Sequence, residues 1–126
     1  MWTATTDGYF SAVQHRDKPG KLMVRARDSK DLIRVREAGY DIGRIIAMRD
    51  ADYPYRVVVD KAEWGRYLAD SAAGVDYENF KKRIHRDDPE RERIYLMVWS
   101  ALTHIEENDW DRELVAVVAA DEAGRP

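Results

Sequence analysis

Apart from one short helix expected at residues 30–38, the spacing of apolar residues changes along the chain at Asp60. Before Asp60, apolar residues recur at every second position between turn residues, which is typical of strands that bury one face. After it they recur every three or four residues, as Trp64, Tyr67 and Leu68 do, which is typical of amphipathic helices. Segregated strands and helices predict an α+β fold. We expect a mainly antiparallel sheet of four or five strands in residues 2–59, packed against three or four C-terminal helices.

Turn and capping residues divide the two halves into elements. Asp7-Gly8 predicts a two-residue hairpin turn, and residues 17–20 predict a four-residue hairpin loop. Ser29 and Asp76 are candidate N-caps of helices. The expected strands are residues 2–6, 9–16, 21–27, 44–49 and 55–59, and the expected helices are residues 30–38, 61–73, 77–86 and 89–107.

The helix expected from residue 89 has the clearest start. Asp88 is a capping carboxylate, and Pro89 suits the first turn, where a backbone N–H is not needed. Its apolar residues share one stripe, so we expect this helix to be the stability core, with Leu102→Ala costing about 2–5 kcal/mol. The stripe consists of Ile94, Met97, Val98, Ala101, Leu102 and Ile105.

The composition fits one compact domain. A chain of 126 residues that is 44% hydrophobic folds without a disulfide or a metal. The absence of cysteine excludes thiol catalysis and zinc ribbons, and three scattered histidines predict neither a metal site nor a cofactor. The longest apolar run, residues 114–120, is far shorter than the roughly 20 residues of a bilayer span. We therefore expect no membrane insertion and a cytoplasmic location.

The net charge of −3 is unevenly distributed. Residues 1–60 carry eleven basic and nine acidic side chains, residues 61–105 carry eight of each, and residues 106–126 carry two basic and seven acidic. A body this close to neutral lacks the broad basic surface on which duplex binding depends. We expect a single α+β domain over residues 1–107 and an acidic tail over residues 108–126, helical or partly disordered.

Four segments resemble a known group of proteins. They are YFSAVQHR at 9–16, VRAR at 24–27, ADYPYR at 51–56 and DYENFK at 76–81. In this order they resemble small proteins encoded by actinobacteria and their phages, over roughly residues 1–105 and without the acidic tail. The resemblance implies a bacterial or phage source, with the host cytoplasm as location if the source is a phage. It implies no activity and no catalytic residue.

A first candidate site lies on the hairpin of residues 9–16 and 21–27. A four-residue loop sets a register that places arginine, glutamine and phenylalanine side chains on one sheet face. Guanidinium groups bind phosphate through paired N–H groups, and an aromatic ring stacks on a base. The alternative is that the arginines are solvated or pair with acids of a packing helix. The anion-binding candidates are Arg16, Arg25, Arg27, Gln14 and Phe10.

A second candidate is a basic run on the helix expected over residues 77–86. Such a run docks on phosphate or on an acidic protein surface. The acids at residues 106–113, in the same chain or in a second copy, compete with nucleic acid for this run. Its members are Lys81, Lys82, Arg83 and Arg86.

Three large apolar residues are candidates for a subunit interface. Trp99 flanks the main stripe of its helix, so it either widens the buried face or anchors a partner. Trp110, in the acidic tail, leaves the same two alternatives open, and Leu114 of the tail is a candidate together with it.

Motifs of common enzyme classes are absent, including the nucleophile elbow, the phosphate-binding glycine loop and the zinc-protease motif. We expect His15 to be a hydrogen-bonded structural residue and Asp50 and Asp52 to be turn residues, although either set would serve a hydrolase or nuclease. The leading hypothesis is a non-enzymatic protein that acts through protein contacts, including homo-oligomerisation. The alternative is a nucleotide- or nucleic-acid-binding module that uses the arginine-rich sheet face.

Overall fold

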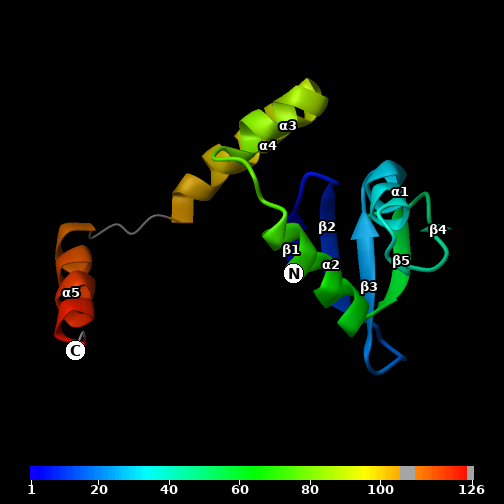
Figure 1. Cartoon of the computed structure of the whole chain (residues 1–126), viewed down its shortest axis with the longest axis horizontal. Helices are drawn as coiled ribbons and strands as arrows, with labels where there is room; N and C mark the ends of the chain where they lie inside the picture. The colour runs from blue at the N-terminus through cyan, green and yellow to red at the C-terminus, as the bar shows by residue number, and fades with distance from the viewer. Residues whose placement is uncertain (106–109, 125–126) are drawn as a thin grey trace. The chain divides into compact units, whose positions relative to one another are not determined.

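A computed structural model describes residues 1–105 and 110–124, with side chains described for residues 1–105 and 116–124. Five strands form one antiparallel sheet in the order β1-β2-β3-β5-β4 (Figure 1). The strands are β1 Trp2–Ala4, β2 Tyr9–Gln14, β3 Lys21–Ala26, β4 Ile46–Ala47 and β5 Tyr55–Asp60. The α+β prediction is confirmed, and the sheet lies in the N-terminal half as expected.

The helices are α1 Ser29–Glu37, α2 Lys61–Ala73, α3 Phe80–Asp87, α4 Pro89–Leu102 and α5 Trp110–Ala123, with a 3-10 turn η1 at Thr103–Ile105. The chain forms two compact units, Met1–Glu78 and Asn79–Pro126, which we call the sheet unit and the helical unit. The sheet unit contains all five strands with α1 and α2. The domain boundary expected at residues 107–108 lies outside the described residues.

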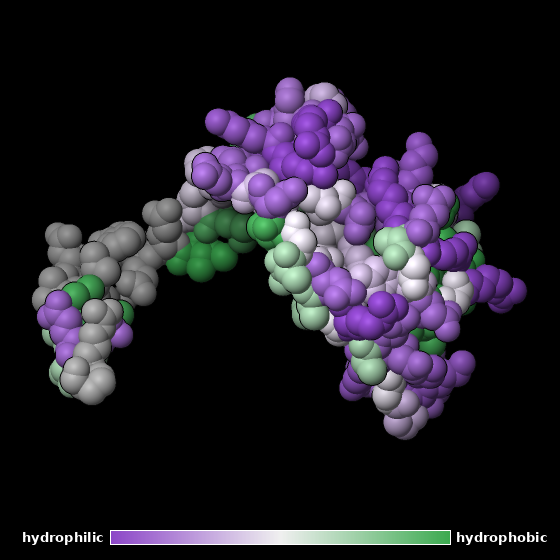
Figure 2. Space-filling model, in the orientation of Figure 1, coloured by the Kyte–Doolittle hydropathy of each residue, from purple (hydrophilic) through white to green (hydrophobic). Residues whose placement is uncertain are grey.

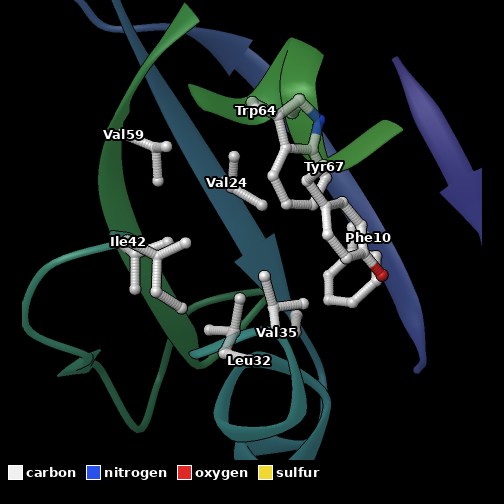
Figure 3. Packing of buried hydrophobic residues seen from close by; sticks show 11 residues of the cluster. Phe10, Val24, Leu32, Val35, Ile42, Val59, Trp64 and Tyr67 are labelled. Atoms are coloured by element: carbon white, nitrogen blue, oxygen red, sulfur yellow. The ribbon is translucent and has the colours of Figure 1, made fainter. Parts of the chain in front are cut away.

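The core of the sheet unit lies between one face of the sheet and helices α1 and α2 (Figure 3). Phe10 meets Trp64 edge-on, with ring centroids 5.3 Å apart, and Trp64 stacks on Tyr67 at 4.8 Å. Aliphatic side chains complete the cluster: Val24, Ala26, Leu32, Val35, Ile42, Val57 and Val59. Because strand residues alternate between faces, the other face of the sheet takes no part in this core.

The turn between β1 and β2 lies one residue earlier than expected. Thr5 and Gly8 exchange two backbone hydrogen bonds, of 2.9 and 3.3 Å, so the turn residues are Thr6 and Asp7. Gly8 has no positive φ, but a Cβ atom there would lie 2.2 Å from the Cγ of Asp31 on α1. Glycine is therefore required at this position by a close approach of α1, and its assignment as a turn residue was wrong.

The register of the β2–β3 hairpin also differs from the expected one by one residue. Ser11 pairs with Arg25 and Ala12 with Val24, whereas a four-residue loop pairs Ser11 with Ala26. A slip of one residue exchanges the two faces of one strand relative to the other. The predicted arrangement of side chains on this hairpin was therefore wrong.

The last pair of the β2–β3 hairpin is His15 with Lys21, whose carbonyl accepts the His15 N–H at 3.1 Å, and this pair leaves a loop of five residues, 16–20. Local hydrogen bonds explain the length of the loop. The Lys21 N–H donates to the Lys18 carbonyl at 3.2 Å, across a Pro-Gly turn. His15 Nδ1 accepts the N–H groups of Asp17 and Lys18, both at 3.1 Å. The expectation that His15 is a hydrogen-bonded structural residue is confirmed.

Helix ends follow side-chain caps, two of which the sequence analysis misplaced. Asp28, not Ser29, caps α1 by accepting the N–H two residues on, at 2.9 Å. Asn79, not Asp76, caps α3, so that helix begins three residues later than expected. Asp88 caps α4 as expected, and α2 has the expected bounds.

Helix α4 is not a buried core element, contrary to expectation. It has no buried residue, and Leu102 is 55% exposed. The periodicity correctly located an apolar stripe, but within the described residues nothing covers that stripe. Leu102→Ala in an isolated chain is therefore expected to cost under about 1 kcal/mol, because the side chain is already half in water.

The tail contains helix α5, on which Trp110 and Leu114 lie. The side chains of these two residues lie outside the described residues. None of the helices, as far as the structure describes them, is both long and apolar enough to span a membrane.

Glu63 links α2 to the segment before β4, and this link predicts a pH dependence. Its carboxylate accepts Arg66 Nε at 2.7 Å and the Asp41 N–H at 2.8 Å. The Arg66 bond, followed by the Asp41 bond, lowers the pKa of Glu63 from 4.5 to about 2. A lowered pKa stabilises the fold above the unfolded value of 4.5, and that stabilisation is lost as the pH falls toward 2.

We therefore expect Glu63→Gln to lower the free energy of unfolding at neutral pH. The gap between wild type and variant should narrow as the pH falls through the window from 4.5 toward 2. Urea unfolding of both proteins at a series of pH values measures the gap. A gap that stays constant across this window would show that the ionised carboxylate contributes nothing.

Candidate functional site

The sheet face opposite α1 and α2, which we call the outer face, carries a row of aligned side chains. Strand pairing places one residue of each strand in this row: Trp2, Ser11, Arg25, Arg56 and Ile46. Residues paired across adjacent strands point to the same face, so these side chains are neighbours. Trp2 stands at one edge with 74% of its surface exposed.

Three arginines of the outer face converge on Tyr53, which the loop between β4 and β5 carries. The guanidinium carbons of Arg25 and Arg27 lie 4.8 and 4.6 Å from the centroid of the Tyr53 ring. Arg56 Nη2 donates to the Tyr53 carbonyl at 3.2 Å. We call Arg25, Arg27 and Arg56 the arginine cluster. Tyr53 is buried, so its ring holds two guanidinium groups in place through cation–π attraction.

The arginine cluster is short of acidic partners. Arg27 pairs with the exposed Asp52 at 3.2 Å, but among the described residues no carboxylate pairs with Arg25 or Arg56. Arg25 donates instead to Ser11 Oγ at 2.8 Å. The Nε atoms of Arg25 and Arg56 are buried without a hydrogen-bond partner in the described part of the chain. An anion at this position would offset the repulsion between two directly opposed cations.

Two of the five predicted anion-binding residues, Arg25 and Arg27, belong to this cluster. Phe10 is fully buried on the opposite face of the sheet, in the core. Gln14 is exposed at the end of β2 and donates to backbone carbonyls of the hairpin, and Arg16 is exposed in the loop. The structure thus does not bring Phe10, Gln14 and Arg16 together with the arginine cluster.

The sequence analysis did not assign Arg56 or Tyr53 to the anion-binding site. The sequence does contain a signal for Arg56, because Val57 and Val59 must face the core and an alternating strand then turns Arg56 to the outer face. Tyr53 follows no such rule. Its position depends on how a loop folds back over the sheet, which periodicity does not describe.

The residues of the hydrolase or nuclease hypothesis have structural partners. His15 Nδ1 accepts two backbone N–H groups, and Asp52 pairs with Arg27. In the ranges that the structure describes, no three His, Asp or Glu side chains gather as a metal site requires. Nothing in the geometry joins Asp50 or Asp52 to a nucleophile.

An open hollow of about 470 Å³ lies beside α2. Arg66 is its one basic lining residue, and it already pairs with Glu63. The remaining charges of the hollow are negative, so it does not suit a phosphate. Its lining consists of Gly20, Asp41, Asp60, Ala62, Glu63 and Arg66.

The second candidate surface is an apolar face of α4. On the side of α4 that meets α3, Phe80 stacks on Tyr95 at 5.7 Å and Ile84 is buried. Away from that contact, large apolar side chains are exposed along the helix, and Figure 2 shows the apolar patch over α4. At 100° per residue they fall within about 140° of the helix circumference. We call this set the α4 face: Ile94, Met97, Val98 and Leu102 of α4, with Ile105 of the adjoining η1.

The predicted basic patch on α3 is partly paired within the helical unit. Arg83 and Arg86 both pair with Asp87, and the Arg83 hydrogen bond is the main cause that lowers the pKa of Asp87. The Lys81 ammonium lies 5.3 Å from the centroid of the Trp99 ring, and Lys82 is exposed. The acids expected to pair with this patch, at residues 106–113, are not described as side chains.

Comparison with protein-family models, with curated proteins and with solved structures finds no match for this chain. The resemblance to actinobacterial and phage proteins therefore stays a prediction. Function has to be argued from the two surfaces described above.

Proposed function

We propose that the protein is a non-enzymatic, self-associating protein in which the α4 face binds the α4 face of a second copy. We place it in the cytoplasm of a bacterium, or of a phage-infected host, as its composition and resemblance indicate. The observation that carries the proposal is a 14-residue helix without one buried residue, on which four exposed large apolar side chains form a stripe that Ile105 of η1 extends. Contiguous exposed apolar surface of this kind marks interaction sites in soluble proteins.

The size of the α4 face supports pairing of two copies. Met97 is 65% exposed and Ile105 76% exposed, so burial against a partner removes most of two large side chains from water. Two such faces together bury an area on the order of 1,000 Å², the lower bound for a specific interface. Trp99, 58% exposed beside the α4 face, adds the kind of side chain that dominates interface energies.

Symmetry and charge also favour a second copy. Two identical apolar faces are self-complementary about a two-fold axis, and an antiparallel pair of α4 helices opposes their dipoles. Residues 79–105 carry six basic and four acidic side chains, whereas residues 106–126 carry two basic and seven acidic. The tail of one copy is therefore complementary in charge to the α3–α4 hairpin of the other, including Lys82 and Arg86.

The mass of the full chain in solution tests the proposal. We expect light scattering and sedimentation to give twice the chain mass of 14.7 kDa at micromolar concentration, with dissociation on dilution. Raising the salt concentration should weaken the dimer only modestly, because apolar burial dominates its stability. A mass of 14.7 kDa at every concentration tested would refute self-association and assign the α4 face to a different protein.

A further inference from the structure

We propose that the outer face of the sheet binds single-stranded nucleic acid, with the arginine cluster on a backbone phosphate and Trp2 on a base. The site belongs to the sheet unit and does not depend on the α4 face. Its first support is that Arg25 and Arg56 are directly opposed cations, and that no carboxylate among the described residues pairs with either of them. Their paired positions on β3 and β5 direct both guanidinium groups at the same point.

The chemistry of this point suits a phosphate oxyanion. Arg25 and Arg56 each have one N–H group engaged, with Ser11 Oγ and the Tyr53 carbonyl, which fixes their orientation. The remaining N–H groups form forks of the kind that bind phosphate oxygens in pairs. The Tyr53 ring holds the guanidinium groups of Arg25 and Arg27 by cation–π contact, so little ordering of these two side chains remains to be done on binding.

The surroundings favour a polymer over a small molecule. The outer face is a sheet surface, whereas small-molecule sites are concave, and the hollow beside α2 is acidic. Trp2 lies in the same cross-strand row as Arg25, two strand spacings or about 10 Å away. An exposed indole at that distance can stack a base adjoining the bound phosphate. Tyr9, whose ring centroid is 6.2 Å from that of Trp2, extends the aromatic surface.

Single strands are favoured over a duplex because few charges are available. The sheet unit has thirteen basic and thirteen acidic residues, so it cannot release the many counterions that duplex binding requires. A single strand offers stacking, which depends little on salt. Contact with one phosphate predicts a slope of about −0.7 for the logarithm of the association constant against the logarithm of salt concentration.

Fluorescence anisotropy of the full chain with a labelled oligothymidylate of about 15 nucleotides tests the site. We expect Arg25→Gln with Arg56→Gln to weaken binding at least about a hundredfold, through the loss of two charge-assisted contacts. The melting temperature of the unbound variant should change little, because the loss of an opposed pair of cations offsets the loss of the hydrogen bonds to Ser11 Oγ and the Tyr53 carbonyl. Trp2→Ala should weaken binding about tenfold or more and remove the quenching of tryptophan fluorescence.

Lys30→Gln with Lys61→Gln is the matched control. It removes the same charge from exposed positions on α1 and α2, which cover the other face, and should leave binding unchanged. Equal binding by the two double variants would overturn the proposal. Undetectable oligonucleotide binding at low salt would also overturn it, as would a salt-dependence slope of the wild type near that of a duplex-binding protein. The proposal is equally wrong if a double-stranded oligonucleotide, oligoglutamate or inorganic phosphate binds as tightly as the single strand. The salt dependence is measured on the wild-type chain, so it tests the proposal even if a substituted chain fails to fold.

Discussion

The double substitution Ile94→Glu with Val98→Glu should convert the protein from a dimer to a monomer. Both residues lie near the centre of the α4 face, one helical turn apart. In a two-fold pair, four carboxylates would enter an apolar interface without partners, and each such burial costs several kcal/mol. We expect the dimer dissociation constant to rise at least about a thousandfold, which corresponds to about 4 kcal/mol. Sedimentation equilibrium measures it.

Leu96→Glu with Ser100→Glu is the control for this substitution. It has the same spacing, the same helix and the same added charge, but it lies about 200° around α4 from the α4 face. The control should remain a dimer. Helix content should stay unchanged in both variants, because glutamate is a good helix former and the replaced side chains are exposed. Equal effects of the two variants would mean that added charge, and not the α4 face, controls association.

The example of α4 shows which part of a fold periodicity can predict. Spacing of Ile94, Val98 and Leu102 correctly indicated a helix with one apolar stripe. This spacing carries no information about what covers the stripe. Because one core was assumed for the whole chain, the stripe was expected to pack against the sheet. The sheet, however, already buries its apolar face with α1 and α2, through Trp64 and Tyr67. An apolar helix left over after the core is complete indicates an interface.

The prediction of the arginine positions shows how an error of one residue in the length of a loop changed the composition of the candidate anion-binding face. The strands of the β2–β3 hairpin were predicted correctly within about two residues, but its loop was taken to be one residue too short. The hydrogen bonds of His15 that lengthen the loop involve a side chain and the backbone, and no periodic pattern contains them. With the register shifted, Phe10 was assigned to the face of Arg25, and Arg56 was overlooked.

Gly8→Ala should be the most destabilising single substitution considered for the sheet unit. An added Cβ would lie 2.2 Å from the Cγ and 2.5 Å from the Oδ2 of Asp31. Asp31 is 2% exposed and accepts hydrogen bonds from the Tyr9 N–H and from Arg34, so it has little room to move. The substitution overpacks this site and displaces a buried, hydrogen-bonded carboxylate. We therefore expect the free energy of unfolding to fall by about 3 kcal/mol or more. That is a large fraction of the total stability of a domain of this size.

Gly65→Ala is the matched control, because a Cβ at Gly65 meets nothing within 4 Å and the residue lies inside α2. Alanine should stabilise the helix there by about 0.5–1 kcal/mol. If the close approach of α1 is what destabilises Gly8→Ala, urea unfolding should show a lower free energy of unfolding for Gly8→Ala and a higher one for Gly65→Ala than for the wild type. Asp31→Gly completes the comparison, since it removes the Cβ, Cγ and Oδ2 atoms that the new Cβ would meet. Gly8→Ala should then cost much less in that background, and an undiminished cost would place the strain in the turn backbone instead.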